Sequence, residues 1–136
     1  MKDFSGLLHA MRFLTVIPIP FAKETDERIF TSSMMFFPLV GFFIGVVCAF
    51  LSYLLSLFFS PFMTSALVVA LWVVLTGALH LDGFADTADG IGGGRDREER
   101  LAIMKDSRIG TFGAVSLFLV LILKVAFLSE LTESYP

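Results

Sequence analysis

Charged residues are scarce in this sequence. Asp, Glu, Lys and Arg together make up 17% of its 136 residues, against about 25% in ordinary soluble domains. Hydrophobic residues make up 56%, and 16 residues are Phe. A chain this short buries a small fraction of its surface on folding, so a soluble domain could not hide so much apolar surface. The composition excludes disorder and predicts one integral membrane domain over residues 1–136.

Cysteine pairs and an excess of positive charge are also missing. Cys48 is the single cysteine and lies in an apolar run, which excludes a disulfide scaffold and a thiolate metal site. We expect it to pack as a small buried hydrophobe. The formal net charge of −3 gives no basic surface for nucleic acid. The sequence contains no phosphate-binding loop of the Gly-Lys-Ser/Thr type, no dinucleotide fingerprint and no nucleophilic triad.

Long uncharged runs dominate what is present. Met34–Phe59 and Phe62–Leu81 each reach the ~20 residues that cross a ~30 Å hydrocarbon core. Ser60–Pro61 separates them, and because Pro favours the first turn of a new helix, the two runs predict a helical hairpin. A third run, Phe112–Ser129, carries Lys124, whose long stem lets its ammonium group reach an interface. We expect an all-α polytopic membrane protein with about three spans.

The first residues predict an amphipathic helix at the membrane surface. One face carries Phe4, Leu7, Leu8 and Met11, and the other carries Ser5, His9 and Arg12. The segment Ile17–Pro20 cannot continue a helix because it contains two prolines. The charged positions and the lack of a small-residue cleavage site argue against a signal peptide.

Positive charges in the loops set the expected orientation. Ala22–Ser33, with Lys23 and Arg28, and Asp82–Arg108 carry Lys and Arg residues, whereas the hairpin tip at Ser60–Pro61 carries none. Both charged segments lie on the same side of the hairpin, and the positive-inside tendency makes that side cytoplasmic. We therefore expect the chemistry of the protein to face the cytoplasm.

Three aspartates form the strongest functional signal. Asp82, Asp86 and Asp89 are spaced i, i+4 and i+7, so on a helix they share one stripe. Like charges at this spacing repel, and the segment has no cation before Arg95. Oxygen-only ligands favour Mg²⁺, then Mn²⁺ or Ca²⁺; the alternative is a solvated helix end. His80 falls on the opposite side of such a helix, where a buried, hydrogen-bonded role competes with a role as general base.

A glycine run follows at Gly90–Arg95. We expect the glycines to end the helix and to leave backbone N–H groups uncovered, so that Gly92, Gly93 and Arg95 form an anion-binding loop. A flexible hinge is an equally good interpretation, because glycine-rich loops are common. The run therefore leaves both interpretations open.

A charged segment precedes the last span. Asp96–Met104 predicts a short amphipathic helix in which Asp96 and Arg100 pair at i, i+4. Three polar side chains come next: Lys105, Ser107 and Arg108. Cations and a hydroxyl at the mouth of a span suit a phosphate group, although positive-inside anchoring also explains them. A metal site beside a phosphate site favours phosphoryl transfer.

Several longer motifs carry a family resemblance. RFLTVIPIP at 12–20, FFPLVGFFIG at 36–45, ALHLDGFADTADG at 78–90 and GGRDREERLAIMKDSRIGTFG at 93–113 resemble the cobalamin synthases, also called adenosylcobinamide-GDP ribazoletransferases. The motifs occur in the family's order and cover nearly the whole chain. The resemblance implies that residues 1–136 correspond to the N-terminal half of a longer family member.

The resemblance also implies an activity. A hydroxyl of α-ribazole, or of its 5′-phosphate, attacks the cobinamide-bearing phosphorus of adenosylcobinamide-GDP, which expels GMP and yields adenosylcobalamin or its 5′-phosphate. Mg²⁺ is the implied cofactor and the cell inner membrane the implied location; homo-oligomer formation stays open. Asp82, Asp86 and Asp89 are expected to hold the metal, with one of them or His80 accepting the proton. Phosphate contacts are expected from Lys105, Ser107, Arg108, Arg95, Gly92 and Gly93.

Two other functions compete with this expectation. Asp86–Gly90 matches the opening Asp-x-x-Asp-Gly of the CDP-alcohol phosphotransferase signature, but the expected Ala-Arg that follows is absent. A cation-transport or assembly subunit would use aspartates as an ion path, yet the ionisable residues here gather at one end of the spans rather than along them.

Overall fold

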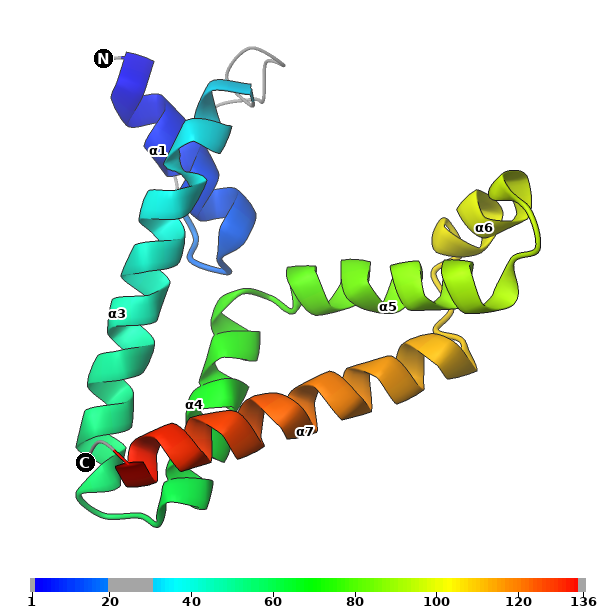
Figure 1. Cartoon of the computed structure of the whole chain (residues 1–136). Helices are drawn as coiled ribbons and strands as arrows, with labels where there is room; N and C mark the ends of the chain where they lie inside the picture. Colours follow the sequence, from blue (N-terminus) through cyan, green and yellow to red (C-terminus); the bar gives the residue numbers. More distant parts are fainter. Residues whose placement is uncertain (1, 20–30, 135–136) are drawn as a thin grey trace.

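The computed structural model describes residues 2–19 and 31–134 of the chain, and within these ranges the regular structure is entirely helical. The elements are α1 (Lys2–Leu14), the short 3₁₀ helix η1 (Met34–Phe36), α3 (Phe37–Ser56), α4 (Pro61–Leu75), α5 (Leu79–Gly93), α6 (Arg97–Met104) and α7 (Thr111–Ser134). Figure 1 shows their arrangement: α3 and α4 run side by side, and α7 passes beneath α5 and crosses α4. The loop cations Lys23 and Arg28, and Pro20, lie outside the described residues.

The α3–α4 hairpin is confirmed. α3 ends at Ser56, and α4 begins with Pro61 in its first turn. The Ser60 hydroxyl accepts a hydrogen bond from the Met63 N–H at 3.5 Å, which covers one of the free donors at the start of α4. Serine and proline therefore start the second helix at the position that the sequence predicts.

The second apolar run is not one continuous helix, and this part of the prediction is wrong. α4 ends at Leu75, and α5 starts at Leu79 at 89° to it. Gly77 and Ala78 both adopt positive φ, at 59° and 58°, a left-handed conformation that interrupts a right-handed helix. The turn also packs tightly on the segment after α1, where the Val16 N–H donates to the Leu75 carbonyl at 2.9 Å.

α1 packs against α3, and its buried face differs from the predicted one. His9, assigned to the polar face, is only 8% exposed, and Ala10 and Leu14 are buried beside it. The His9 ring nitrogen Nδ1 donates to the Ser5 carbonyl at 2.8 Å, so the buried ring has a hydrogen-bond partner. The burial follows from packing on a protein helix, since α1 contacts α3.

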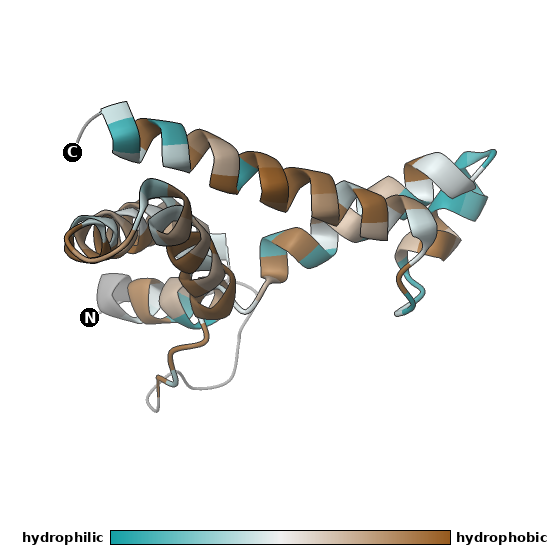
Figure 2. Cartoon of the chain, turned by 90° about the horizontal axis from the view of Figure 1, so that it is seen from below, coloured by the Kyte–Doolittle hydropathy of each residue, from teal (hydrophilic) through white to brown (hydrophobic). Residues whose placement is uncertain are grey.

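Apolar side chains cover most of the long helices. Thr31–Ser56 and Thr111–Ser134 are each long and apolar enough to cross a membrane, and the bent pair α4–α5 gives a third candidate span. Figure 2 shows hydrophobic colour along these helices and hydrophilic colour around α6. Few side chains of the candidate spans are buried, as expected where lipid replaces a protein core. The chain is an all-helical membrane protein.

The turn between α4 and α5 gives a first prediction. Gly77→Ala places a Cβ 3.0 Å from Val16 at a residue with positive φ. A left-handed residue with a side chain costs about 1–2 kcal/mol, so we expect the variant to unfold at a lower temperature in detergent micelles. Gly83→Ala is the matched control, because a Cβ at that helical glycine meets nothing within 4 Å. Equal loss in both variants would contradict this account of the turn.

Candidate functional site

α5 carries the three predicted aspartates on one helix. Asp82 is exposed, Asp86 is half-buried and Asp89 is buried, so the stripe runs from the open end of α5 into its packed end. Within the described ranges, no group of three or more His, Cys, Asp or Glu side chains is arranged to hold a metal ion. The aspartates share a helix face, as predicted, but they do not form a three-carboxylate cluster.

Asp89 has partners of its own. Its two carboxylate oxygens accept hydrogen bonds from the backbone N–H groups of Gly110 and Gly113, both at 2.7 Å. The Gly110 carbonyl accepts the first helical hydrogen bond of α7, from Ala114. Gly110 is therefore the N-cap of α7, and Gly113 is its third residue. The carboxylate covers two donors that the helix itself leaves free.

This contact replaces a capping box. In a capping box, the side chains of the N-cap and of the third residue bond each other's N–H, but here both positions are glycine. Asp89, 7% exposed, performs both functions from the neighbouring helix, and its charge faces the positive end of α7. A Cβ at Gly110 or Gly113 would collide with the carboxylate, so glycine is required at both positions.

Asp82 and Asp86 differ from Asp89 in having free carboxylates. Neither side chain makes a hydrogen bond or an ion pair with the part of the chain that the structure describes. The two residues lie one turn apart on the same helix, and both offer only oxygen ligands. Mg²⁺ is usually held by one or two carboxylates together with substrate phosphates and water. The pair fits such an ion without a third protein ligand.

α5 ends within the glycine run, as predicted, but only at the last of its four glycines. The helix continues through Gly93, and only Gly94 leaves it. The glycines instead allow close helix packing, because a Cβ at Gly90 would lie 2.6 Å from Met104 of α6 and one at Gly92 would collide with Phe112 of α7. Gly92 and Gly93 are exposed helical residues, so their N–H groups do not form the loop expected to bind an anion.

The predicted pair Asp96–Arg100 is also not formed. The Asp96 carboxylate accepts from the Glu99 N–H at 2.9 Å and so caps α6. The Glu99 carboxylate accepts from the Arg95 N–H at 2.8 Å, and Arg100 donates to the Gly94 carbonyl at 3.0 Å. The N-cap hydrogen bond of Asp96 stabilises α6 more than an ion pair with Arg100 would, because an exposed i, i+4 pair contributes only ~0.3–0.5 kcal/mol to helix stability. The side chain of Arg95 is exposed.

The cationic loop follows α6 and is joined to α5 through Asp89. Lys105 and Ser107 are exposed, and Arg108 forms an ion pair with Asp106 at 2.6 Å. Hydrogen bonds from Arg108 lower the pKa of the Asp106 carboxyl, so this carboxyl keeps its charge to a lower pH than an isolated aspartate does. Asp106 is not among the residues predicted from the sequence; its place two residues before Arg108 is the signal that could have revealed the pair.

His80 lies apart from the aspartate stripe, as its position on the helix predicts. It is exposed rather than buried and makes no hydrogen bond with the described residues, so the expectation of a buried, hydrogen-bonded histidine is wrong. It lines a cavity with Thr76, Phe84 and Lys124, and none of the three aspartates lines that cavity.

Fold and site together define a helical membrane protein with an acidic helix turned away from its span and a cationic loop fixed beside it. A family model described as Cobalamin-5-phosphate synthase matches residues 6–136, and the chain belongs to this family. The match agrees with the resemblance in the motifs and favours it over the CDP-alcohol phosphotransferase and the cation-transport subunit.

Relatives with curated names support the same family. The adenosylcobinamide-GDP ribazoletransferase of Acetivibrio thermocellus is 44% identical over 98% of this chain and 54% of its own length. Proteins of the same name from Chlorobium phaeobacteroides and Shewanella frigidimarina are each 46% identical, over 93% and 100% of the chain and 50% and 52% of their own lengths. The chain thus spans about half the length of the curated relatives it matches. No solved structure matches it.

The Asp89 contact gives a second prediction. Asp89→Ala removes two hydrogen bonds to a charged group, each contributing about 1.5–3 kcal/mol, so we expect the free energy of unfolding in micelles to fall by about 3 kcal/mol or more. Asp89→Asn keeps one acceptor and should lose less. Asp86→Ala, which removes a carboxylate without partners, should change stability by about 0.5 kcal/mol or less. Equal stability of Asp89→Ala and Asp86→Ala would refute the capping role.

Proposed function

We propose that this chain supplies the metal-binding helix of an adenosylcobinamide-GDP ribazoletransferase. The reaction transfers the adenosylcobinamide phosphate group to a hydroxyl of α-ribazole or its 5′-phosphate, forming the new P–O bond and releasing GMP. One observation carries the proposal: a family member presents two free carboxylates, Asp82 and Asp86, one turn apart on a helix that leaves the apolar span.

Asp82 and Asp86 would hold Mg²⁺ together with oxygens of the substrate's diphosphate. When bound, the ion neutralises charge on the diphosphate and on the leaving GMP. We assign Asp89 to the structure rather than to the metal, because both of its oxygens already accept hydrogen bonds from α7. The proton of the attacking hydroxyl would pass to Asp82 or Asp86, since His80 lines a separate cavity.

The loop after α6 would bind the phosphate oxygens. Lys105 and Ser107 are exposed there, and Arg108 has one partner, Asp106, on the same loop. A phosphate with two or more charges is a better partner for a guanidinium than one exposed carboxylate, so binding of the substrate would draw Arg108 from Asp106. Asp89 keeps this loop beside α5, because it holds Gly110 at the start of α7.

The cationic segments favour a cytoplasmic position for this site. The exposed cations of α6 and its loop stand at the end of α5 remote from the α3–α4 tip, and the positive-inside tendency assigns such segments to the cytoplasm. A cell inner membrane protein with the site facing the cytoplasm would receive a water-soluble nucleotide substrate directly.

The metal assignment gives a third prediction. Asp86→Asn in the purified enzyme should lower the rate of GMP release from adenosylcobinamide-GDP by more than about a hundredfold, because even outer-shell changes at metal sites cost 10–100-fold. Asp82→Asn should also raise the Mg²⁺ concentration needed for half-maximal rate. The measurement is GMP released over time in a Mg²⁺ titration.

Asp96→Asn is the matched control for this experiment. It removes one negative charge from the same segment but keeps a good N-cap residue on α6. Its rate and Mg²⁺ dependence should remain close to those of the unchanged enzyme. Near-normal turnover by Asp86→Asn would remove this residue from the metal site.

A further inference from the structure

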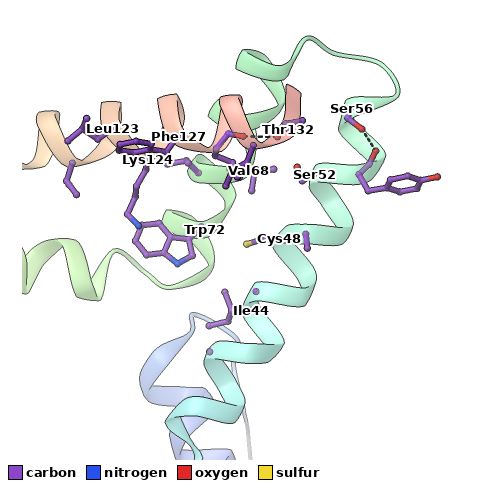
Figure 3. Close-up of a pocket in the computed structure, with 18 residues that line it drawn as sticks. Ile44, Cys48, Ser52, Ser56, Val68, Trp72, Leu123, Lys124, Phe127 and Thr132 are labelled. Atoms are coloured by element: carbon purple, nitrogen blue, oxygen red, sulfur yellow. Dashed lines mark hydrogen bonds between the residues drawn. The ribbon is translucent and has the colours of Figure 1, made fainter. Parts of the chain in front are cut away.

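A large apolar cavity lies between α3, α4 and α7. Its volume is about 930 Å³, and its walls include Ile44, Cys48, Val68, Trp72 and Phe127 (Figure 3). Cys48 lies on this wall and is only half-buried, so the expectation that it is fully buried is wrong. The cavity is in the size range of sites that hold drug-sized ligands.

Two hydroxyl groups at one end of the cavity, those of Ser56 and Thr132, are satisfied by their own helices. Ser56 Oγ donates to the Tyr53 carbonyl at 2.8 Å, and Thr132 Oγ1 donates to the Leu128 carbonyl at 2.8 Å. These groups therefore add little polarity to the wall. Along α3, the lining extends from Gly41 to Ser56, a rise of roughly 22 Å. The cavity is long and apolar.

Lys124 is the one charged residue on this wall among the residues that the structure describes. It lies within α7, a candidate membrane span, and its ammonium group sits 4.4 Å from the centre of the Trp72 ring (Figure 3). No acidic side chain of the described ranges pairs with it. An ionisable residue within a span usually has a counter-charge, and the aromatic ring supplies only part of one.

A second cavity of about 470 Å³ meets the first at Lys124. It lies at the turn between α4 and α5, and its wall includes Thr76 and His80. Trp72 and Lys124 line both cavities. The ionisable side chains, Lys124 and His80, therefore lie at the end of the cavity system next to α5, and the apolar part extends from there toward the hairpin tip.

From this arrangement we infer that the two cavities form a binding site for an anionic membrane phospholipid. Its phosphate lies at the α4–α5 turn against Lys124 and within reach of His80, and one acyl chain lies in the apolar cavity between α3 and α7. The site is separate from the aspartate stripe and does not depend on the proposed transferase reaction.

Charge and shape together favour this occupant. A small water-soluble anion would satisfy Lys124 but leave the 930 Å³ apolar cavity unfilled. An uncharged lipid would fill that cavity but leave the ammonium group without a counter-ion. A phospholipid with a net negative charge satisfies both requirements, and the membrane spans place it within reach.

The experiment uses the single tryptophan of the chain, Trp72, as a reporter. The protein in uncharged detergent micelles is titrated with dioleoylphosphatidylglycerol and, in parallel, with zwitterionic dioleoylphosphatidylcholine. We expect the anionic lipid to change the Trp72 emission and to raise the unfolding temperature at about a tenth of the mole fraction that the zwitterionic lipid needs. Lys124→Gln should abolish this difference.

Two further variants separate the site from general effects. Gly45 lines the apolar cavity, and a Cβ there meets nothing within 4 Å, so Gly45→Leu should block the acyl chain while leaving Lys124 in place. This variant should therefore also lose the difference between the lipids. Arg97→Gln removes an exposed cation on α6 outside both cavities and should keep the response of the unchanged protein.

Three outcomes would overturn the inference. Equal responses to the two lipids in the unchanged protein would exclude a site for anionic lipid. The same Trp72 change with inorganic phosphate alone would show a site for a free anion. A full response in both Gly45→Leu and Lys124→Gln would place lipid binding elsewhere on the protein. This result is independent of the GMP-release assay on the aspartate variants, which tests the proposed transferase reaction.

Discussion

The carboxylate of Asp89 ties the start of α7 to α5. Asp89 of α5 bonds the N–H groups of Gly110 and Gly113 and so caps α7 from outside, where most helices are capped by their own residues. The contact fixes the start of α7 against α5 and holds the intervening α6 and its cationic loop beside the acidic helix. Without it, only the packing on the glycines of α5 and the hydrogen bond from Arg100 to the Gly94 carbonyl would hold the charged segment, among the contacts described above.

The position of α5 explains how the chain presents acidic groups in a membrane protein. Ionised carboxylates within a hydrocarbon core are costly, but the 89° turn after α4 directs α5 away from the span. The buried end of α5 packs on α7 through Asp89. Its other two carboxylates, Asp82 and Asp86, make no hydrogen bond or ion pair with the described residues, and this is why the proposed metal ion is assigned to them. The stripe thus contains one carboxylate with a structural role and two without protein partners.

Hydropathy predicted the membrane helices well, since length and lack of charge suffice for that purpose. The sequence also predicted the hairpin at Pro61 and the shared face of the three aspartates. It missed the turn at Gly77 and Ala78, because only the backbone conformation shows the break in an apolar run. It did not reveal the packing of the glycine run or the hydrogen bonds of Asp89 for a common reason: both depend on tertiary contacts, with Met104, Phe112 and Gly113. The sequence motifs predicted the family, and the match of the family model to residues 6–136 confirmed that prediction.

Amide hydrogen exchange at Gly110 and Gly113 tests the division of roles along the stripe most directly. The account predicts that both amides exchange slowly, and equally slowly with and without saturating Mg²⁺, because Asp89 holds them independently of the metal. Exchange as fast as that of an exposed loop amide would contradict the cap. Loss of protection on adding Mg²⁺ would show that Asp89 is a metal ligand after all.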